Sequence, residues 1–380
     1  PSSAASDVYK RQGYDLVIIN GRSDRLSYIM IDDDHVEIRD ADHLAGKTTW
    51  ETDEIIKEEV GDPEVQTLAI GLAGENKVVM ANLTCNIGRN IGGCGIGAVF
   101  GSKNLKAIAV RGTKSVRIAK VEEFKKACEE AYNHILSNPV YKSYSKYGTS
   151  ILSGILEAVG ALPVKNWQTV VFPDIEKQDG PYFVKNYVSK WKGCFSCPVH
   201  CSHYYSIREG AYSGTSGEGV EYETINAWGA RSGNKDIAPI LYVNNLCNQL
   251  GLDTISTGGA IATCMHWWQD GLIDEKDTDG LILEWGNYQA MIELLEKIAK
   301  REGFGNILAD GILRAAEKIA YALSRNGAKP VLEKRKPVKL WVVKRDGLIY
   351  RIIGTGGHLY TTEFAKTVHE LSLIHISEPT

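Results

Sequence analysis

Three cysteines, Cys194, Cys197 and Cys201, stand three and four positions apart in a chain of 380 residues. Thiolates with this spacing, and with no matching fourth nearby, are typical of a chain that binds three corners of an iron–sulfur cube while the fourth ligand comes from elsewhere. A structural zinc site is the alternative. Zinc ribbons usually add a second close cysteine pair or a histidine pair, and only His200 and His203 lie nearby. The spacing favours a cluster.

The remaining cysteines are scattered and do not resemble a disulfide framework; they are Cys85, Cys94, Cys128, Cys247 and Cys264. The N-terminal residues show no signal-peptide pattern, so we expect metal or redox chemistry in a reducing compartment. Apolar residues make up 43% of the chain and charged residues 24%, as in ordinary globular proteins. The net charge of -4 gives no reason to expect nucleic-acid binding, and no apolar run is long enough to span a membrane. We therefore expect a cytoplasmic enzyme.

The segment 88–101 carries six glycines in fourteen residues, with Arg89 and Lys103 as flanking positive charges. Such a segment can turn tightly and aim backbone amides at anionic oxygens. It fails the P-loop pattern, because Ser-Lys follows Gly101. Residues 93–98 fit the dinucleotide fingerprint formally, but a strand at 105–110 follows where that motif needs a helix. Structural glycines at sheet corners are the alternative. We favour a phosphate-bearing cofactor that is not a simple dinucleotide.

Carboxylates follow the third cysteine in the sequence Glu218-Gly-Val-Glu221-Tyr-Glu223. Glu221 and Glu223 would share a face of an extended segment but diverge on a helix. Paired carboxylates can hold a metal or transfer protons, and burial near a cofactor would raise the pKa of one of them. A solvated acidic turn is the alternative.

The stretch 248–256 predicts the end of one helix and the start of the next. Gly251 suits the position after a helix C-terminus, and Asp253 can cap the following helix. Capping is sufficient to explain Asp253, although the same geometry also presents amides and a carboxylate to a polar heterocycle.

The elements that must position these residues change in type along the chain. Short runs rich in β-branched residues predict strands at 14–20, 27–31, 67–71, 77–82 and 105–110. A short helix is expected at 52–59, with Thr52 as its N-cap. From Val121 onward the pattern is helical, with helices at 237–250, 256–270, 287–301 and 307–323. One apolar stripe marks the third of these, formed by Ala290, Met291, Leu294, Leu295, Ile298 and Ala299.

This change of pattern predicts an α+β fold. We expect a β-rich N-terminal domain at 13–115, a mainly α-helical domain at 116–328 that carries the cysteine motif, and the start of a truncated C-terminal region at 329–370. The basic, proline-containing segment 329–344 is expected to be a linker or a surface strand. Residues 1–12 and 371–380 resemble translated sequencing adapter, so we expect them to be the non-native ends of a fragment cut from a longer gene.

Taken together, these segments resemble the aldehyde:ferredoxin oxidoreductase family of tungsten enzymes. The resemblance runs from about residue 13 to residue 323, and its matching stretches are 40–47, 74–76, 95–112, 194–201, 221–224 and 251–256. It implies a β-rich domain that cradles two pyranopterin dithiolenes, with helical domains behind it. It also implies a tungsten ion, or molybdenum, a [4Fe-4S] cluster, and Mg²⁺ bridging the pterin phosphates.

The resemblance also implies roles for single residues. Cys194, Cys197 and Cys201 would be three cluster ligands. Glu223 would be a proton-handling carboxylate near the metal, and Glu221 would be its neighbour. Asp253 would bind a pterin ring, and Gly95 and Gly97 would lie against pterin phosphate. The full set expected to bind the cofactor is Arg89, Gly93, Gly95, Gly97, Lys103, Asn248, Gly251 and Asp253. The fourth cluster cysteine would lie beyond the fragment.

The implied activity is the oxidation of an aldehyde to a carboxylic acid, with electrons leaving through the cluster to ferredoxin or another low-potential carrier. A homodimer or a complex of redox subunits is implied as well. Two departures suggest a divergent branch. Asn248 stands where the family usually has Asp, and Gly92-Gly93-Cys94-Gly95 replaces the family's Gly-Arg-Gly-Gly, so an arginine is lost and a cysteine is gained. One such branch is the tungsten subunit of the benzoyl-CoA reductase type, which acts on an aromatic acyl-CoA. A zinc-stapled, non-enzymatic scaffold is the third hypothesis.

Overall fold

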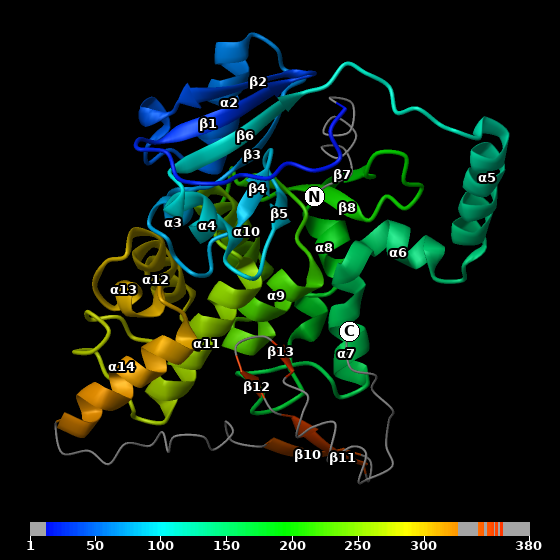
Figure 1. The fold of residues 1–380 in the computed structure, drawn as a ribbon. Helices are drawn as coiled ribbons and strands as arrows, with labels where there is room; N and C mark the ends of the chain where they lie inside the picture. The colour runs from blue at the N-terminus through cyan, green and yellow to red at the C-terminus, as the bar shows by residue number, and fades with distance from the viewer. Residues whose placement is uncertain (1–12, 326–340, 346–347, 353, 356–357, 360–380) are drawn as a thin grey trace.

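The computed structural model describes residues 13–325, 341–345, 348–352, 354–355 and 358–359. The first part of this structure is a six-stranded mixed sheet in the order β2-β1-β6-β3-β4-β5 (Figure 1). Only β1 and β6 pair in parallel; the other neighbours are antiparallel. The strands are β1 (Ser27–Asp32), β2 (His35–Asp40), β3 (Gln66–Ala69), β4 (Leu83–Cys85), β5 (Arg89–Ile91) and β6 (Leu105–Arg111).

Both faces of this sheet are covered, because β1 and β6 alternate between two apolar clusters. Tyr28 and Met30 of β1 pack on the face that also buries Ile56 of helix α2 (Thr49–Val60). Ile29 and Ile31 pack on the opposite face, with Phe100 of α4 (Ile96–Ser102). Successive side chains of a strand point to opposite faces, so an uninterrupted apolar run is expected for a strand covered on both sides.

Three of the five predicted strands are confirmed and two are wrong. The runs 27–31, 67–71 and 105–110 correspond to β1, β3 and β6. Residues 14–20 form no strand, and Leu16 and Ile18 are exposed. Residues 77–82 form turns with one isolated bridge from Ala81 to Leu252, because Val79 and Asn82 donate their amides to loops of the helical part. The short strands β4 and β5 and the exposed β2 lacked a clear apolar pattern.

Helix α2 begins earlier than the sequence pattern predicted. Thr48, not Thr52, is its N-cap: the Thr48 hydroxyl accepts from the Glu51 amide, and the Glu51 carboxylate accepts from the Thr48 amide. This reciprocal arrangement is a capping box. Thr52 instead donates its hydroxyl to the Thr48 carbonyl one turn before it.

The second part is mainly helical and includes a small antiparallel sheet in the order β7-β8-β9. Its strands are β7 (Val188–Lys192), β8 (Ser202–Ser206) and β9 (Ser216–Glu218). Its helices are α5 (Val121–Ser137), α6 (Tyr141–Tyr147), α7 (Leu152–Ala158), α8 (Gly180–Asn186), α9 (Tyr222–Trp228), α10 (Ile237–Leu250), α11 (Thr254–Gln269), α12 (Tyr288–Lys300), α13 (Gly303–Leu308) and α14 (Ile312–Arg325). No helix in the described ranges is both long and apolar enough to cross a membrane.

The helix predictions are confirmed except the last. Helices α10, α11 and α12 match the predicted ranges to within two residues, and every member of the α12 apolar stripe is buried. The predicted helix 307–323 is instead two helices, α13 and α14, separated at Gly311, whose φ of +92° is incompatible with a right-handed helix. An extended connection, residues 112–120, joins β6 to α5, which stands apart from the sheet (Figure 1).

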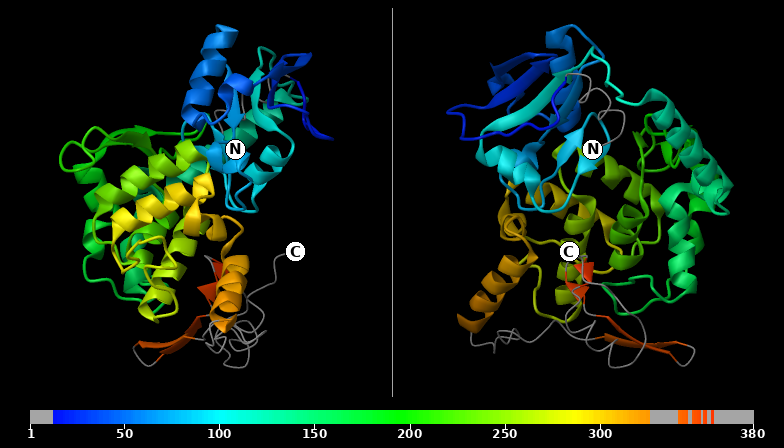
Figure 2. Two further views of the ribbon diagram at one scale, coloured as in Figure 1. Left: turned by 90° about the vertical axis from the view of Figure 1, so that its left-hand side faces the viewer. Right: turned by 45° about the vertical axis from the view of Figure 1, so that its right-hand side comes forward.

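A strip of backbone joins the sheet to the helical part. After α3 (Leu72–Glu75) the chain passes into the larger apolar core, where Val78, Met80 and Ala81 are buried with residues of α10 to α13. Figure 2 shows the sheet lying above this helical body. The terminal segments 1–12 and 371–380 and most of the linker 329–344 lie outside the described residues. Beyond 340 the structure describes the pairs β10 (Trp341–Arg345) with β11 (Leu348–Ile352) and β12 (Gly354–Thr355) with β13 (His358–Leu359).

Candidate cofactor site

The three cysteines lie on one loop, residues 193–201, between the antiparallel strands β7 and β8. The amide of Cys197 donates to the carbonyl of Cys194 at 3.0 Å, and Ser196 has a left-handed φ of +53°. All three thiols are partly buried. Among the described residues, no group of three His, Cys, Asp or Glu side chains is arranged around a single metal ion. A cubane cluster, by contrast, spreads its cysteines over separate iron atoms.

Helices α5 and α6 hold the backbone of this cysteine loop. The Tyr132 hydroxyl of α5 donates to the carbonyl of Ser196 at 2.5 Å, and the Tyr141 hydroxyl of α6 donates to that of Pro198 at 3.2 Å. Gly148, which follows α6 with a φ of +62°, packs directly on the carbonyl of Cys201 and leaves no space for a Cβ. The loop conformation is therefore fixed by elements some fifty residues earlier.

His203, one of the two histidines near the motif, has a packing role. It is buried, its Nε2 lies 3.0 Å from the carbonyl of Lys146, and its ring meets those of Phe183 and Trp191 edge-on. Burial lowers its pKa, which favours the neutral ring. His200 is exposed.

A buried carboxylate joins the glycine loop to the cysteine loop. Glu218, at the end of β9, lies 2.6 Å from the guanidinium of Arg89 in β5 and 2.6 Å from the ammonium of Lys192 in β7. Its side chain is only 3% exposed. Burial is the largest cause and opposes both positive charges, but Glu218 together with other neighbouring groups outweighs it, so the pKa values of Arg89 and Lys192 are raised. Cys194 and Glu221 also contribute to the raised pKa of Arg89.

The glycine loop contains three successive residues with positive φ: Gly93, Cys94 and Gly95. The amide of Gly93 donates to Oδ2 of Asp253 at 2.7 Å. Helix α4 follows the loop directly, so the expectation that a strand comes next was wrong; β6 begins only after this seven-residue helix. The helix is short because Gly95 starts it and the Lys103-Asn104 turn ends it.

Close packing against the protein's own backbone accounts for several glycines of the loop. A Cβ on Gly95 would lie 2.6 Å from the Val79 carbonyl oxygen, and one on Gly97 would overlap the Asn82 carbonyl oxygen. Packing against the backbone is thus sufficient to explain glycine at these two positions, without a ligand. Gly93 differs, because a Cβ there would meet nothing within 4 Å. Open space beside the loop is found at Gly93.

Asp253 caps α11 as expected. Its Oδ1 accepts from the amides of Ile255 and Ser256, while Oδ2 accepts from Gly93. Gly251 has the left-handed φ of +71° that ends α10. Asn248 is buried, and its side-chain oxygen accepts from the Asn90 amide group of β5 at 2.7 Å. Asn248 and Asp253 therefore meet residues 89–95, whereas Gly251 packs against Gly71.

The two candidate catalytic carboxylates diverge, as expected for a helix. Glu221 is the N-cap residue of α9, accepts a short hydrogen bond from the Thr149 hydroxyl, and helps raise the pKa of Cys201, for which burial is the largest cause. Glu223, in the first turn, is exposed and acts electrostatically on Arg231. Arg231 is buried, and burial lowers its pKa to about 10. Glu221 thus lies near the cysteines, and Glu223 on another side of α9.

Lys103 is not brought to the glycine loop. It follows the C-terminal end of α4, and its ammonium donates to the carbonyl of Gly21 at 2.9 Å. The helix separates it from Gly95 by about 10 Å. The pairing of Arg89 and Lys103 around one ligand is therefore not realised.

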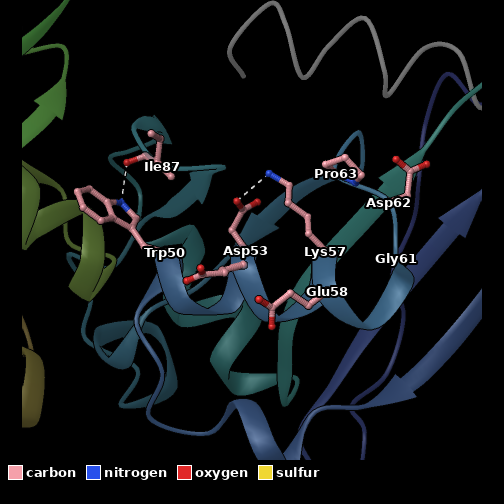
Figure 3. Close-up of a pocket in the computed structure, with 9 residues that line it drawn as sticks. Trp50, Asp53, Lys57, Glu58, Gly61, Asp62, Pro63 and Ile87 are labelled. Carbon is pink, nitrogen blue, oxygen red and sulfur yellow. Dashed lines mark hydrogen bonds and ion pairs between the residues drawn. The ribbon is translucent and has the colours of Figure 1, made fainter.

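A surface hollow of about 630 Å³ lies elsewhere, along α2 (Figure 3). Trp50 closes one end by donating its indole N–H to the carbonyl of Ile87, and Asp53 pairs with Lys57 at 2.8 Å. The hollow is lined by Trp50, Asp53, Glu54, Lys57, Glu58, Gly61, Asp62, Pro63 and Ile87, none of which belongs to the candidate site.

Neither the part played by Glu218 nor that of the residues that fix the cysteine loop was predicted from the sequence. Glu218 belongs to the acidic motif, but only its burial in the folded structure distinguishes it from the exposed Glu221 and Glu223. Tyr132, Tyr141 and Gly148 carry no local signal, because their role depends on a contact across some fifty or sixty residues.

Comparison with known proteins identifies the family. The model "Aldehyde ferredoxin oxidoreductase, N-terminal domain" matches residues 2–112, and "Aldehyde ferredoxin oxidoreductase, domains 2 & 3" matches residues 126–371. The tungsten-containing aldehyde ferredoxin oxidoreductases of Pyrococcus furiosus and Pyrococcus horikoshii are each 42% identical, over 314 and 316 residues. These alignments cover 82% and 81% of this chain and 51% of each relative. The chain thus spans about half the length of the curated relatives it matches.

Two further relatives differ in function. An aliphatic sulfonate oxidoreductase, WOR-like subunit, from Pyrococcus furiosus is 32% identical over 324 residues, 82% of this chain and 51% of the relative. The solved active site complex BamBC of benzoyl coenzyme A reductase, with 1,5 dienoyl-CoA, matches with a TM-score of 0.71 and 29% identity. That match covers 84% of this chain and 50% of the other. The chain belongs to the aldehyde ferredoxin oxidoreductase family.

Proposed function

We propose that this chain is the cofactor-binding part of a tungsten–pterin oxidoreductase that oxidises an aldehyde to a carboxylic acid. The observation that carries the proposal is the link between the glycine loop and the cysteine loop: Glu218 pairs at 2.6 Å both with Arg89 of the first segment and with Lys192, two residues before Cys194. Family membership and 42% identity to tungsten-containing aldehyde ferredoxin oxidoreductases support it. Ferredoxin is the proposed electron acceptor, and a homodimer or a complex of redox subunits is the proposed assembly.

The residues present fit the proposed groups. Three partly buried thiols on one short loop that directly follows Lys192 are a suitable donor set for a [4Fe-4S] cluster. The open face at Gly93, with Arg89 nearby, suits a phosphate-bearing group. Asn248 and Asp253 bond to the same segment, residues 89–95, and Gly251 forms the turn between them. All eight cysteines of the chain are free thiols, which agrees with the proposed reducing, cytoplasmic setting.

When bound, the tungsten–pterin group, with a molybdenum counterpart as the alternative, would supply the two-electron chemistry and the cluster the one-electron transfer. The protein's own residues bind, orient and move protons. Cys194, Cys197 and Cys201 would hold the cluster. Glu223, whose carboxylate is exposed on α9, would take or give the substrate's proton, and Glu221 would remain at the cysteine side.

Reduction of an aromatic acyl-CoA is the second candidate function, and the structural match to the BamBC complex favours it. Anaerobically purified full-length protein distinguishes the two. We expect the protein to reduce a viologen dye with aldehydes as electron donors and not with dienoyl-CoA. Viologen reduction with dienoyl-CoA and none with aldehydes would select the second function. Elemental analysis should find tungsten or molybdenum together with iron. Zinc without iron and without tungsten or molybdenum would reject both redox functions in favour of a zinc-stapled scaffold.

The role of Glu223 has its own test. Glu223→Gln should lower kcat by about 100-fold or more, the usual contribution of a positioned general acid or base, while metal content stays that of the wild type. Glu221→Gln is the matched control, because it removes the same charge two residues away on the other side of α9. Equal losses in both variants would contradict the assignment.

A further inference from the structure

Glu218 is a buried carboxylate shared by two cations from different parts of the chain. Its Oε1 lies 2.6 Å from Arg89 and its Oε2 lies 2.6 Å from Lys192, while the Ser202 hydroxyl lies 3.3 Å from Oε1. The two cations are less buried, with side chains 24% and 34% exposed. Of the three charged side chains, Glu218, Arg89 and Lys192, the carboxylate of Glu218 is the most buried.

The backbone around Glu218 is anchored as well. The Glu218 carbonyl accepts from the Asn244 side chain of α10 at 3.4 Å, and the next amide, Gly219, donates to the carbonyl of His203 at 2.9 Å. The backbone that carries the carboxylate is therefore held by α10 and β8 as well as by the two ion pairs.

Each cation is placed next to one of the two loops of the site. Arg89 begins β5, three residues before Gly92 and four before Gly93 of the glycine loop. Lys192 ends β7, with one residue between it and Cys194. One negative and two positive charges leave a net positive charge beside the thiols.

Stability alone gives a weak reason for such a group. A buried ion pair contributes little net stability compared with well-packed apolar residues, whereas removal of one partner leaves a costly unpaired charge. Its stronger effect is on geometry and field, because charges fixed in a poorly solvated region act on their neighbours with little screening.

We propose that Glu218 is a positioning residue that holds Arg89 and Lys192 beside the cysteine loop and so sets the reduction potential and the retention of the cluster bound there. The inference rests on the proposed function, because it takes Cys194, Cys197 and Cys201 as cluster ligands. It assigns to Glu218 no contact with substrate or cofactor.

The test uses the full-length holoenzyme, purified anaerobically, with two readouts other than turnover. One is the midpoint potential of the cluster from an EPR-monitored titration, and the other is the rate at which a chelator removes iron. Glu218→Gln removes a negative charge, so the midpoint should shift to a more positive value, and iron loss should be several-fold faster. Lys192→Met removes a positive charge and should shift the midpoint the opposite way. Glu218→Asp keeps the charge and should return the midpoint toward the wild-type value.

The matched control is Glu75→Gln, which breaks another buried pair of the same kind. Glu75 on α3 lies 2.5 Å from the buried ammonium of Lys106, in the sheet part of the molecule. This variant should lose thermal stability without any change in midpoint potential or iron release.

The outcomes distinguish failure of the proposed function from failure of the positioning role of Glu218. A wild-type protein without any iron–sulfur signal would overturn the proposed function itself. A wild-type cluster whose midpoint and iron release are unchanged in Glu218→Gln would overturn the positioning role alone. If Glu218→Gln does not fold, Lys192→Met carries the test, and an unchanged midpoint there rejects the inference.

Discussion

At the scale of single residues, the glycine loop combines two kinds of glycine that the sequence presents identically. Gly93 and Gly95 both have a φ near +70°, at +69° and +67°. Only Gly95 has backbone where a Cβ would be, with the Val79 carbonyl oxygen 2.6 Å away; Gly93 faces open space. Both positions therefore need a residue that tolerates a positive φ, but only Gly95 also needs a residue without a Cβ.

Alanine at these two positions should separate the two requirements. Gly93→Ala should cost about 1–2 kcal/mol of unfolding free energy, the usual cost of a left-handed conformation for a residue with a Cβ. Gly95→Ala should cost about 1–3 kcal/mol more, because the Val79 backbone must move to relieve the overlap. Denaturant unfolding of both variants measures the difference. Equal losses would mean that the contact relaxes without cost.

Lys106 gives a pH-dependent prediction at the same scale. It is buried in β6, with Glu75 and the Lys47 carbonyl as its partners. Burial lowers its pKa from 10.5, and Glu75 only partly offsets this. Between the lowered folded-state pKa and the unfolded-state value, the unfolded chain binds more protons, so the unfolding free energy should rise with pH in that window. Below the lowered pKa the contribution of Lys106 is constant.

The measurement compares unfolding free energies of the wild type and Lys106→Met from neutral pH to about 10.4, the ordinary lysine value. The rise should be present in the wild type and absent in the variant. Glu75→Gln should extend the rise to lower pH, because it removes the group that favours the charged lysine. Parallel pH curves for all three proteins would show that Lys106 does not titrate in this range.

At the scale of elements, a helix or strand could be predicted where it is long enough for its apolar residues to repeat at a regular spacing. Helix α12 repeats its apolar positions over three turns, and the structure buries all six of them. Strands β4 and β5 have three residues each, too few to form a pattern, yet they carry Arg89 and shape the site. The run at 14–20 has the composition of a strand but pairs with none in the structure, because composition does not supply a neighbouring strand.

The site was predictable where chemistry is local. The cysteine spacing, the Gly251 turn and the Asp253 cap follow from short-range rules, and the structure has the turn and the cap in place. The charge group around Glu218 could not be predicted, because Arg89, Lys192 and Glu218 come from three strands in two sheets. A pattern in sequence does not indicate which distant carboxylate a cation will meet.

The α12 stripe leads to a prediction with an internal control. Leu294 is fully buried in the helical core, while Leu313 on α14 is 73% exposed. Leu294→Ala should cost about 2–5 kcal/mol, because it removes buried methyl groups and leaves a cavity. Leu313→Ala makes the same chemical change at the surface and should stay within about 0.5 kcal/mol of the wild type. Thermal unfolding of both variants is the measurement, and similar losses would contradict the packing described here.

At the scale of the whole molecule, the sheet lies above the helical body (Figure 2). Backbone groups of residues 76–82 join the two parts. Val79 donates its amide to the Ala309 carbonyl, and Asn82 donates its amide to the Gly251 carbonyl. The cofactor loops lie on both sides of this junction, with the glycine loop in the sheet part and Asp253 in the helical part. Relative movement of the two parts would therefore separate the candidate cofactor residues.

Arg301, at the end of α12, is the side chain that most directly closes this junction. Its Nε donates to the Asn76 carbonyl at 2.6 Å, another guanidinium nitrogen donates to the Lys77 carbonyl at 3.0 Å, and a third pairs with Asp310 at 3.0 Å. Hydrogen bonds to a charged group contribute about 1.5–3 kcal/mol each, so Arg301→Gln should speed amide hydrogen exchange by about tenfold or more around residues 76–82. Exchange in β1 and β6 should stay unchanged, because both strands lie inside the sheet. Arg314→Gln, at an exposed position of α14, is the control. Unchanged protection around residues 76–82 would show that the shared apolar core, and not Arg301, holds the two halves of the cofactor site together.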